Sequence, residues 1–221
     1  MTDRLGRLVV SLHIPKTGGT SFAAVLERAF PGQVAYFYKA HNRRTHSLLR
    51  ERGRALDPQV IDELEAAGVC VLHGHGAFST YAPAVPEPGR YWTWLREPID
   101  RVVSSYHYHR RRQEQPETAG RGPAKAEGVT LSEFARERAN RNQQSRILAG
   151  AALESLGFVG VTERFDESLA RLGLPSAALP KAKNVNRKRP EATPEERRLI
   201  AELNAEDMAL YERALRLQEA S

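Results

Sequence analysis

Cysteine is nearly absent from this sequence of 221 residues: Cys70 is the only one, so no disulfide can form within the chain. Cys70 lies in the apolar run 69–72, where it resembles a small buried hydrophobic residue. No run approaches the roughly 18 apolar residues that a membrane span needs, and residues 1–4 lead into a strand-like segment without the apolar core of a secretory signal. These absences exclude a membrane-spanning helix and predict a cytoplasmic location.

Acidic residues are fewer than basic ones, 27 against 33, which gives a formal net charge of +6 at pH 7. An excess of positive charge favours an anionic partner, which could be nucleic acid, an acidic glycan or a phosphorylated cofactor. Apolar residues make up 41% of the chain and charged residues 27%, as in a soluble globular protein. The length fits one domain with a single core.

The spacing of apolar residues predicts strands that alternate with helices. Strands are expected over 8–14, 69–72, 91–95 and 158–161, and helices over 22–30, 58–67, 98–106 and 165–172. Capping boxes at 130–133 and 193–196 open further helices. This alternation predicts an α/β fold, in which residues 1–221 form a single domain with a central parallel sheet flanked by helices.

Residues 110–128 interrupt the pattern, because they are charged, rich in proline and glycine, and poor in apolar residues. The segment is too long for a tight connection, so we expect a flexible loop that is either a mobile lid or a disordered insert. The adjoining YHYH stretch at 106–109 allows one further interpretation, a basic nucleic-acid-binding module whose aromatic rings contact bases beside Arg110, Arg111 and Arg112.

A glycine-rich loop, HIPKTGGTSF at 13–22, separates the first predicted strand from the first predicted helix. Backbone N–H groups converge in such a loop, and the positive end of the helix dipole adds to their attraction for an anion. A lysine charge and three hydroxyl donors suit phosphate or sulfate oxygens. The alternative is a plain turn at the two glycines, followed by a helix capped by its own hydroxyls. The predicted anion-binding residues are Pro15, Lys16, Thr17, Gly18, Gly19, Thr20 and Ser21.

An ATP-dependent kinase is one alternative for a phosphate-binding loop. In the nucleoside-triphosphate pattern the lysine follows the last glycine, whereas Lys16 precedes both glycines. The strands at 69–72 and 91–95 lead into His73 and Arg96, not into an aspartate that could contact a Mg²⁺ ion. These departures disfavour metal-assisted phosphoryl transfer.

The loop resembles the 5′-phosphosulfate loop of sulfotransferases that use 3′-phosphoadenosine-5′-phosphosulfate (PAPS), especially the carbohydrate branch that contains the heparan sulfate 2-O-sulfotransferase-like proteins. A second segment, WLREPIDRVVSSY at 94–106, is similar to the strand, arginine and helix with which that family binds the 3′-phosphate. The resemblance implies a P-loop nucleotide-binding fold of sulfotransferase type, PAPS as the sulfuryl donor, 3′-phosphoadenosine-5′-phosphate (PAP) as the product, and no metal. It implies that Arg96 and Ser104 bind the 3′-phosphate. Arg187 and Lys188 would reach the same group, although their basic stretch could equally be a solvated one.

Two histidines, His73 and His75, follow the second predicted strand and fall on the same side of it if the extended geometry continues. Such a pair could ligate Zn²⁺, although a catalytic zinc needs three protein ligands, or could serve only structural hydrogen bonds. The resemblance implies instead that His75 is the base for the acceptor hydroxyl and that His73 is a substrate-positioning or supporting residue. In such a transfer, Lys16 and the loop amides would stabilise the negative charge that grows on the bridging oxygen and the sulfuryl group. The resemblance further implies a hydroxyl-bearing acceptor, a glycan or a small glycosylated molecule, and no nucleic acid.

Overall fold

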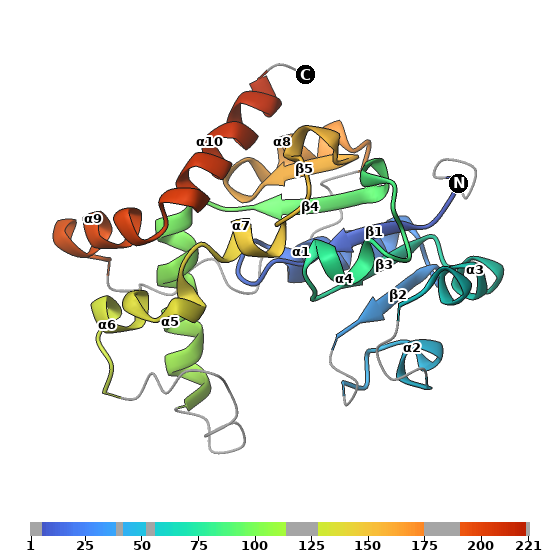
Figure 1. The fold of residues 1–221 in the computed structure, drawn as a ribbon, viewed down its shortest axis with the longest axis horizontal. Coiled ribbons are helices and arrows are strands. Elements are labelled where there is room, and N and C mark those ends of the chain that lie inside the picture. Colours follow the sequence, from blue (N-terminus) through green and yellow to red (C-terminus); the bar gives the residue numbers. More distant parts are fainter. Residues whose placement is uncertain (1–5, 39–41, 52–55, 114–127, 175–190, 220–221) are drawn as a thin grey trace.

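The computed structural model describes residues 6–38, 42–51, 56–113, 128–174 and 191–219 (Figure 1). Two predicted cofactor-binding residues, Arg187 and Lys188, lie outside the described residues, as does most of the loop predicted at 110–128. Among the described helices, none combines the length and the apolar character that a bilayer crossing requires.

A parallel sheet of five strands forms the centre of the described chain, in the order β2-β3-β1-β4-β5. The chain places two strands on one side of β1 and then two on the other side, so a topological switch point lies at the carboxyl end of β1. Open parallel sheets bind their ligands at such a point. The strands are β1 (Val9–Leu12), β2 (Val34–Phe37), β3 (Val71–Gly74), β4 (Tyr91–Leu95) and β5 (Phe158–Val161).

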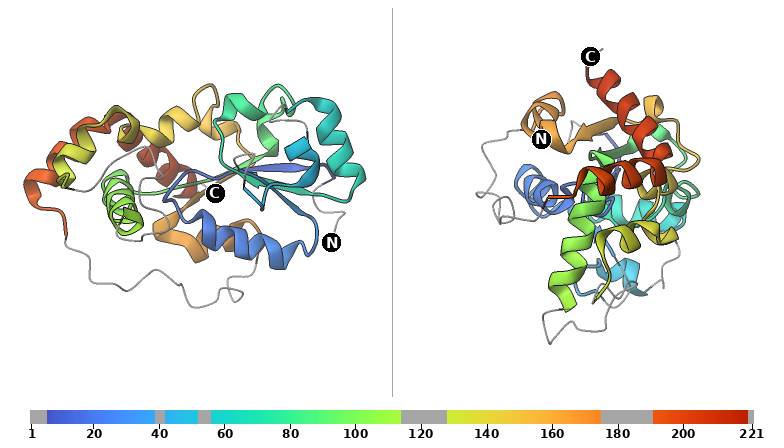
Figure 2. Two further views of the ribbon diagram at one scale, coloured as in Figure 1. Left: turned by 90° about the horizontal axis from the view of Figure 1, so that it is seen from below. Right: turned by 90° about the vertical axis from the view of Figure 1, so that its left-hand side faces the viewer.

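Helices cover both faces of the sheet and continue beyond one end of it (Figures 1 and 2). They are α1 (Gly19–Ala29), α2 (Ser47–Glu51), α3 (Pro58–Ala66), α4 (Phe78–Tyr81), α5 (Pro98–Gln113), α6 (Leu131–Arg136), α7 (Gln143–Ile147), α8 (Phe165–Arg171), α9 (Pro194–Leu203) and α10 (Ala205–Glu219). Short 3-10 turns lie at Pro88–Arg90, Arg138–Asn140, Leu153–Ser155 and Thr162–Arg164.

The core has a layer on each face of the sheet, because successive residues of a strand point to opposite faces. Val9 packs with Phe22 of α1 and Leu169 of α8 on one face. Val10 packs with Ile61 of α3 on the other. Figure 2 shows this division, with α1 and α8 on one side of the sheet and α3 and α4 on the other. A third apolar cluster joins α5, α6 and α9 through Val102, Phe134 and Ile200.

The predicted α/β fold with a central parallel sheet is confirmed, and the strands predicted at 91–95 and 158–161 have the observed bounds. Both capping boxes are present, at Thr130 and Thr193. The loop prediction at 110–128 is wrong in its first four residues, because α5 continues to Gln113; residues 114–127 lie outside the described part. The edge strand β2 was not predicted.

Candidate active site

The carboxyl ends of β1, β3, β4 and β5 meet at one edge of the sheet, where their following loops are joined by side chains. Thr162 follows β5, and its hydroxyl lies between two carbonyl oxygens that can share its single hydrogen, that of Thr17 at 2.8 Å and that of Leu95 at 2.9 Å. The loop before α1 is therefore tied to the end of β4. All the sequence-predicted site residues within the described ranges come from this edge or from α1 and α5 beside it.

Helix α1 begins at a glycine-capped end that suits an anion. Gly18 is the N-cap residue, with a left-handed φ of 86°, and it has no side chain to receive hydrogen bonds from the first turn. The backbone N–H groups of that turn therefore face the open end of the helix, where its dipole is positive. Thr20 is exposed and Ser21 half-buried inside the first turn. The alternative in which these hydroxyls cap the helix is therefore wrong.

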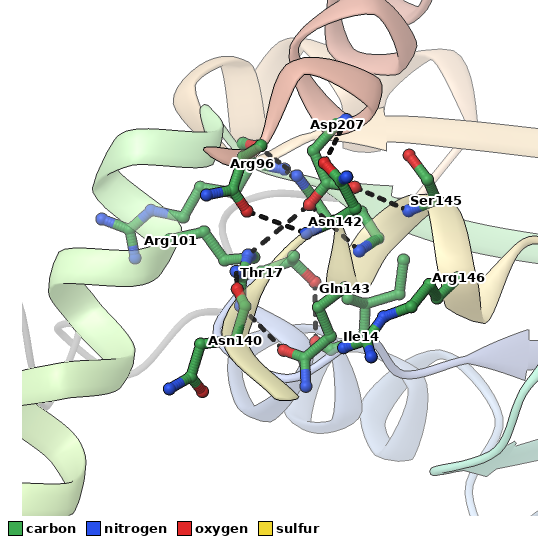
Figure 3. Close-up of polar contacts among 12 residues, drawn as sticks. Ile14, Thr17, Arg96, Arg101, Asn140, Asn142, Gln143, Ser145, Arg146 and Asp207 are labelled. Atoms are coloured by element: carbon green, nitrogen blue, oxygen red, sulfur yellow. Dashed lines mark hydrogen bonds and ion pairs between the residues drawn. The ribbon is translucent and has the colours of Figure 1, made fainter. Parts of the chain in front are cut away.

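Lys16 and Thr17 are adjacent in the loop, but the Lys16 side chain lies against α5 whereas the Thr17 side chain is buried. Lys16 adopts a left-handed backbone, φ 73°, which costs a residue with a Cβ about 1 kcal/mol or more. Its ammonium nitrogen lies 4.3 Å from the centre of the Tyr108 ring on α5. Thr17 is buried and donates its hydroxyl hydrogen bond to the Ile14 carbonyl at 2.9 Å, as Figure 3 shows. Thr17 therefore braces the loop, and Pro15 beside it is half-buried.

The ring of His13 lies over the start of α1. A Cβ atom at Gly19 would come within 2.0 Å of that ring, so this position requires glycine. Burial, reinforced by the charges of His73, His75 and Lys16, lowers the pKa of His13 to about 2. His13 is therefore neutral at physiological pH and adds no positive charge beside the loop.

Three histidine rings are stacked at the ends of β1 and β3, with His13 in the middle. The His13 ring centre is 5.0 Å from that of His73 and 4.2 Å from that of His75. His73 is 0% exposed, and its Nδ1 lies 2.9 Å from the Ser11 hydroxyl. Burial, with smaller contributions from His75 and Arg44, lowers the pKa of His73 to about 3. His73 is thus a neutral, enclosed ring.

His75 is exposed, and its environment selects one tautomer. Its Nδ1 lies 3.0 Å from the carbonyl oxygen of His13. Because a carbonyl can only accept, Nδ1 carries the hydrogen in the neutral ring and the lone pair is on Nε2. Gly74 allows strand β2 to approach closely here, since a Cβ at that position would lie 1.9 Å from the Phe37 carbonyl oxygen. The Tyr38 ring lies 5.0 Å from the His75 ring.

Arg96 follows β4, and its guanidinium contacts the loop that follows β1. Its Nη1 donates to the Lys16 carbonyl at 3.3 Å, and its Nε lies 3.8 Å from a carboxylate oxygen of Glu163. That Nε is buried and makes no hydrogen bond to any described residue. Ser104 is buried on α5, eight positions along the chain. The guanidinium thus lies between the β1 loop and the residues that follow β5.

The aromatic stretch 106–109 does not form one exposed surface. Tyr106 is buried against Phe134, and its hydroxyl donates to the Val129 carbonyl at 3.0 Å. Tyr108 is 36% exposed and lies against Lys16. Since the two tyrosines have different surroundings, the stretch gives no continuous stacking platform for bases. In the part of the chain that the structure describes, no group of three His, Cys, Asp or Glu side chains is arranged to hold a metal.

Among the residues of this edge that were not predicted as site residues are His13, Tyr108 and Gln144. His13 belongs to the glycine-rich motif, and its position between a strand and a glycine pair could have indicated that it lies beside the loop. Tyr108 lies one helical turn beyond Ser104, so a helical-wheel argument could have placed both on one side of α5. Gln144 contacts Arg96 across 48 positions of sequence, for which no local pattern exists.

The fold is a P-loop-containing α/β fold of the type found in sulfotransferases. The structure is similar to the crystal structure of mouse sulfotransferase SULT7A1 complexed with PAP, with a TM-score of 0.51 and 16% sequence identity over 97% of this chain and 88% of that chain. The chain matches no protein-family model and no curated protein sequence. At this identity the similarity establishes the fold.

Proposed function

We propose that the chain is a PAPS-dependent sulfotransferase that transfers a sulfuryl group to a hydroxyl of a carbohydrate by in-line displacement, with His75 as the base. The observation that carries the proposal is the convergence of an exposed, tautomer-fixed His75, a glycine-capped helix end with Lys16, and Arg96 at one sheet edge. The similarity in fold to a sulfotransferase crystallised with PAP supports it. A cytoplasmic location belongs to the same proposal.

The residues at the edge fit a ligand with two separated anionic groups. The backbone amides of the loop, with Lys16, Thr20 and Ser21, would hold the 5′-phosphosulfate at the uncapped end of α1. The guanidinium of Arg96, whose side chain is 26% exposed, would with Ser104 hold the 3′-phosphate. Arg187 and Lys188 are proposed for the same phosphate on the resemblance alone. When bound, PAPS would supply the sulfuryl group and leave as PAP.

As a general base, His75 would act through Nε2. The His13 carbonyl holds the hydrogen on Nδ1, so Nε2 can accept the proton of an acceptor hydroxyl. The adjacent His13 and His73 stay neutral because their pKa values are lowered to about 2 and about 3, and neutral neighbours repel an imidazolium less than charged ones do. His73 therefore acts in this proposal by supporting the stack.

Negative charge that develops during transfer would be stabilised by groups that are already in place. Lys16 and the N–H groups at the start of α1 belong to one loop, which is held by the Thr17 bond to the Ile14 carbonyl and by the Arg96 bond to the Lys16 carbonyl. Preorganised electrostatic stabilisation of this kind usually contributes more to enzyme catalysis than any other single effect.

A sugar hydroxyl is the proposed acceptor. The Tyr38 ring lies 5.0 Å from the His75 ring and is half-buried, so it offers an apolar surface beside the base on which the C–H face of a sugar ring can pack. The resemblance to the carbohydrate branch favours the same class of acceptor.

A ligand-dependent thermal unfolding series tests the proposal. PAP, ATP with Mg²⁺ and a mixed oligonucleotide are added separately, because only a ligand that prefers the folded state raises the midpoint. We expect PAP to raise it and the other two to leave it nearly unchanged. A shift with ATP and Mg²⁺ alone would favour the kinase alternative, and a shift with the oligonucleotide alone would favour nucleic-acid binding.

A further inference from the structure

Gln144 is a buried residue of α7 whose side chain bonds to the backbone of Arg96. The Arg96 N–H donates to the side-chain oxygen of Gln144 at 2.9 Å, and the Gln144 amide nitrogen donates to the Arg96 carbonyl oxygen at 2.9 Å. Gln144 is 0% exposed. The pair of bonds is the pattern that a neighbouring strand would give, so Gln144 fixes the backbone at the first residue after β4.

Gln144 is itself held by α10. Its backbone N–H and that of Ser145 donate to the two carboxylate oxygens of Asp207, at 3.1 and 2.7 Å, so that Asp207 serves as the cap of α7. Figure 3 shows Asp207 above the start of α7, facing Ser145. Asp207 is 0% exposed and lies 3.9 Å from Nε of the buried Arg101 on α5. The anchor of Gln144 is therefore a buried, charged network rather than a surface contact.

Arg101, the cation of this network, makes hydrogen bonds to the segment that precedes Gln144. Its guanidinium donates to the Gln143 side chain at 2.7 Å and to the Asn140 carbonyl at 2.8 Å. Two segments, 140–145 and α10, thus meet α5 between Arg96 and Ser104, the two residues proposed for the 3′-phosphate. The network has the right location to set the relative positions of those two residues.

We infer that Gln144 is a positioning residue for the Arg96 guanidinium and thereby for recognition of the nucleotide 3′-phosphate. This inference rests on the proposed function. The Arg96 backbone is fixed by Gln144 at one end of the residue, and its Nη1 is fixed by the Lys16 carbonyl at the other. Between these two fixed points lies the buried Nε, which faces the Glu163 carboxylate at 3.8 Å and makes no hydrogen bond to any described residue, while the rest of the partly exposed guanidinium is available to the phosphate. If the Arg96 backbone shifted, the guanidinium would move away from the phosphate.

The experiment measures binding of two nucleotides that differ in the 3′-phosphate alone, PAP and 5′-AMP, by isothermal titration calorimetry. The variant is Gln144→Met, which keeps the size of the side chain and removes both hydrogen bonds to Arg96. The matched control is Gln218→Met, since Gln218 also bonds through its amide nitrogen, to the Val159 carbonyl at 3.3 Å and the Ser168 hydroxyl at 2.8 Å, but makes no hydrogen bond to Arg96.

We expect Gln144→Met to reduce the preference for PAP over 5′-AMP about tenfold, because a charge-assisted bond to the 3′-phosphate is weakened while the 5′ end is unaffected. Gln218→Met should keep the native preference. A native preference in Gln144→Met would overturn the inference and leave the proposed function standing. If the unaltered chain shows no preference for PAP, the proposed 3′-phosphate site is wrong and the inference fails with it.

A second variant covers the case in which Gln144→Met does not fold. Gln144→Glu keeps an acceptor for the Arg96 N–H and loses the donor to the Arg96 carbonyl. We expect a smaller loss of the preference for PAP than in the methionine variant, with recovery toward the native value at lower pH, where the introduced carboxyl is protonated and can donate again. A preference equal to that of the unaltered chain at every pH would overturn the inference.

Discussion

The ammonium nitrogen of Lys16 lies 4.3 Å from the centre of the Tyr108 ring, so a loop residue proposed for catalysis rests on the face of an aromatic side chain of α5. A cation over an aromatic face is attracted by about 0.5–1 kcal/mol at an exposed site. That attraction restricts the four-carbon lysine side chain, whose freedom would otherwise spread its charge over a wide volume. Tyr108 therefore restricts the Lys16 side chain, although Tyr108 lies outside both sequence motifs.

Replacing Tyr108 by leucine should lower kcat/KM for sulfuryl transfer about two- to fivefold, because the ring that holds Lys16 is lost. Tyr108→Phe is the matched control, since it keeps the ring and removes only the hydroxyl. Lys16→Ala should cost about a hundredfold or more, as the loss of a preorganised charge usually does. The rates are measured with labelled PAPS, and equal activity of the leucine and phenylalanine variants would show that the ring contact has no effect on transfer.

His75→Ala should abolish transfer while leaving PAP affinity within about twofold of the native value. The base is removed, which typically costs 10²- to 10⁴-fold in rate, whereas the nucleotide-binding groups of the loop are unchanged. Affinity is measured by calorimetry and transfer with labelled donor. His107→Ala is the control for a half-buried histidine elsewhere, on α5. A fully active His75→Ala protein would require a different base.

Much of the fold could be predicted because its signals are local. The strand β4 and the two capping boxes occupy short windows in which apolar spacing or a hydroxyl and a glutamate at fixed separation are sufficient. The loop at 13–22 likewise combines its lysine, glycines and hydroxyls within ten residues. Such features can be recognised in the sequence without knowing which residues pack against them.

The features that were missed depend on distant contacts. Strand β2 is four residues long and is held at the sheet edge by pairing with β3, which starts 34 residues after the end of β2. The last turn of α5 lacks apolar residues, so apolar spacing does not predict it. In the structure this turn carries a contact from the Arg112 guanidinium to the Tyr108 hydroxyl, at 3.5 Å. The stacking of His13 between His73 and His75 needs β1 and β3 in register. Sequence periodicity contains none of this information.

The free energy of unfolding should fall as the pH is lowered from about 6.5 toward about 3. The pKa of His73 is lowered to about 3 in the folded protein by burial, so between these pH values the unfolded chain binds a proton that the folded chain does not. Each such proton contributes about 1.4 kcal/mol per pH unit to the slope. His73→Gln should reduce this slope by up to about 1.4 kcal/mol per pH unit, the contribution of one proton. The slope is measured by urea unfolding at a series of pH values. His107→Gln serves as the control, and an unchanged slope in the His73 variant would contradict the prediction.

Asp207→Asn should destabilise the fold by about 3–5 kcal/mol, because it leaves the buried Arg101 without its opposing charge. Arg101 is 1% exposed, and burial lowers its pKa to about 10 despite the opposing effect of Asp207. The surface pair Arg213–Glu154, at 2.7 Å with both side chains about half exposed, is the matched comparison. Glu154→Gln should change the free energy of unfolding by about 1 kcal/mol or less.

The double variant Arg101→Met with Asp207→Asn separates charge from packing. If the cost of Asp207→Asn comes from an uncompensated buried guanidinium, removing that guanidinium as well should recover part of the lost stability, measured as a coupling free energy in urea unfolding. If the cost comes only from the lost cap of α7, the two substitutions should simply add. Additive costs would show that Asp207 acts through the N–H groups of Gln144 and Ser145 alone, and that the charge of Arg101 contributes nothing to the junction of α5, α7 and α10.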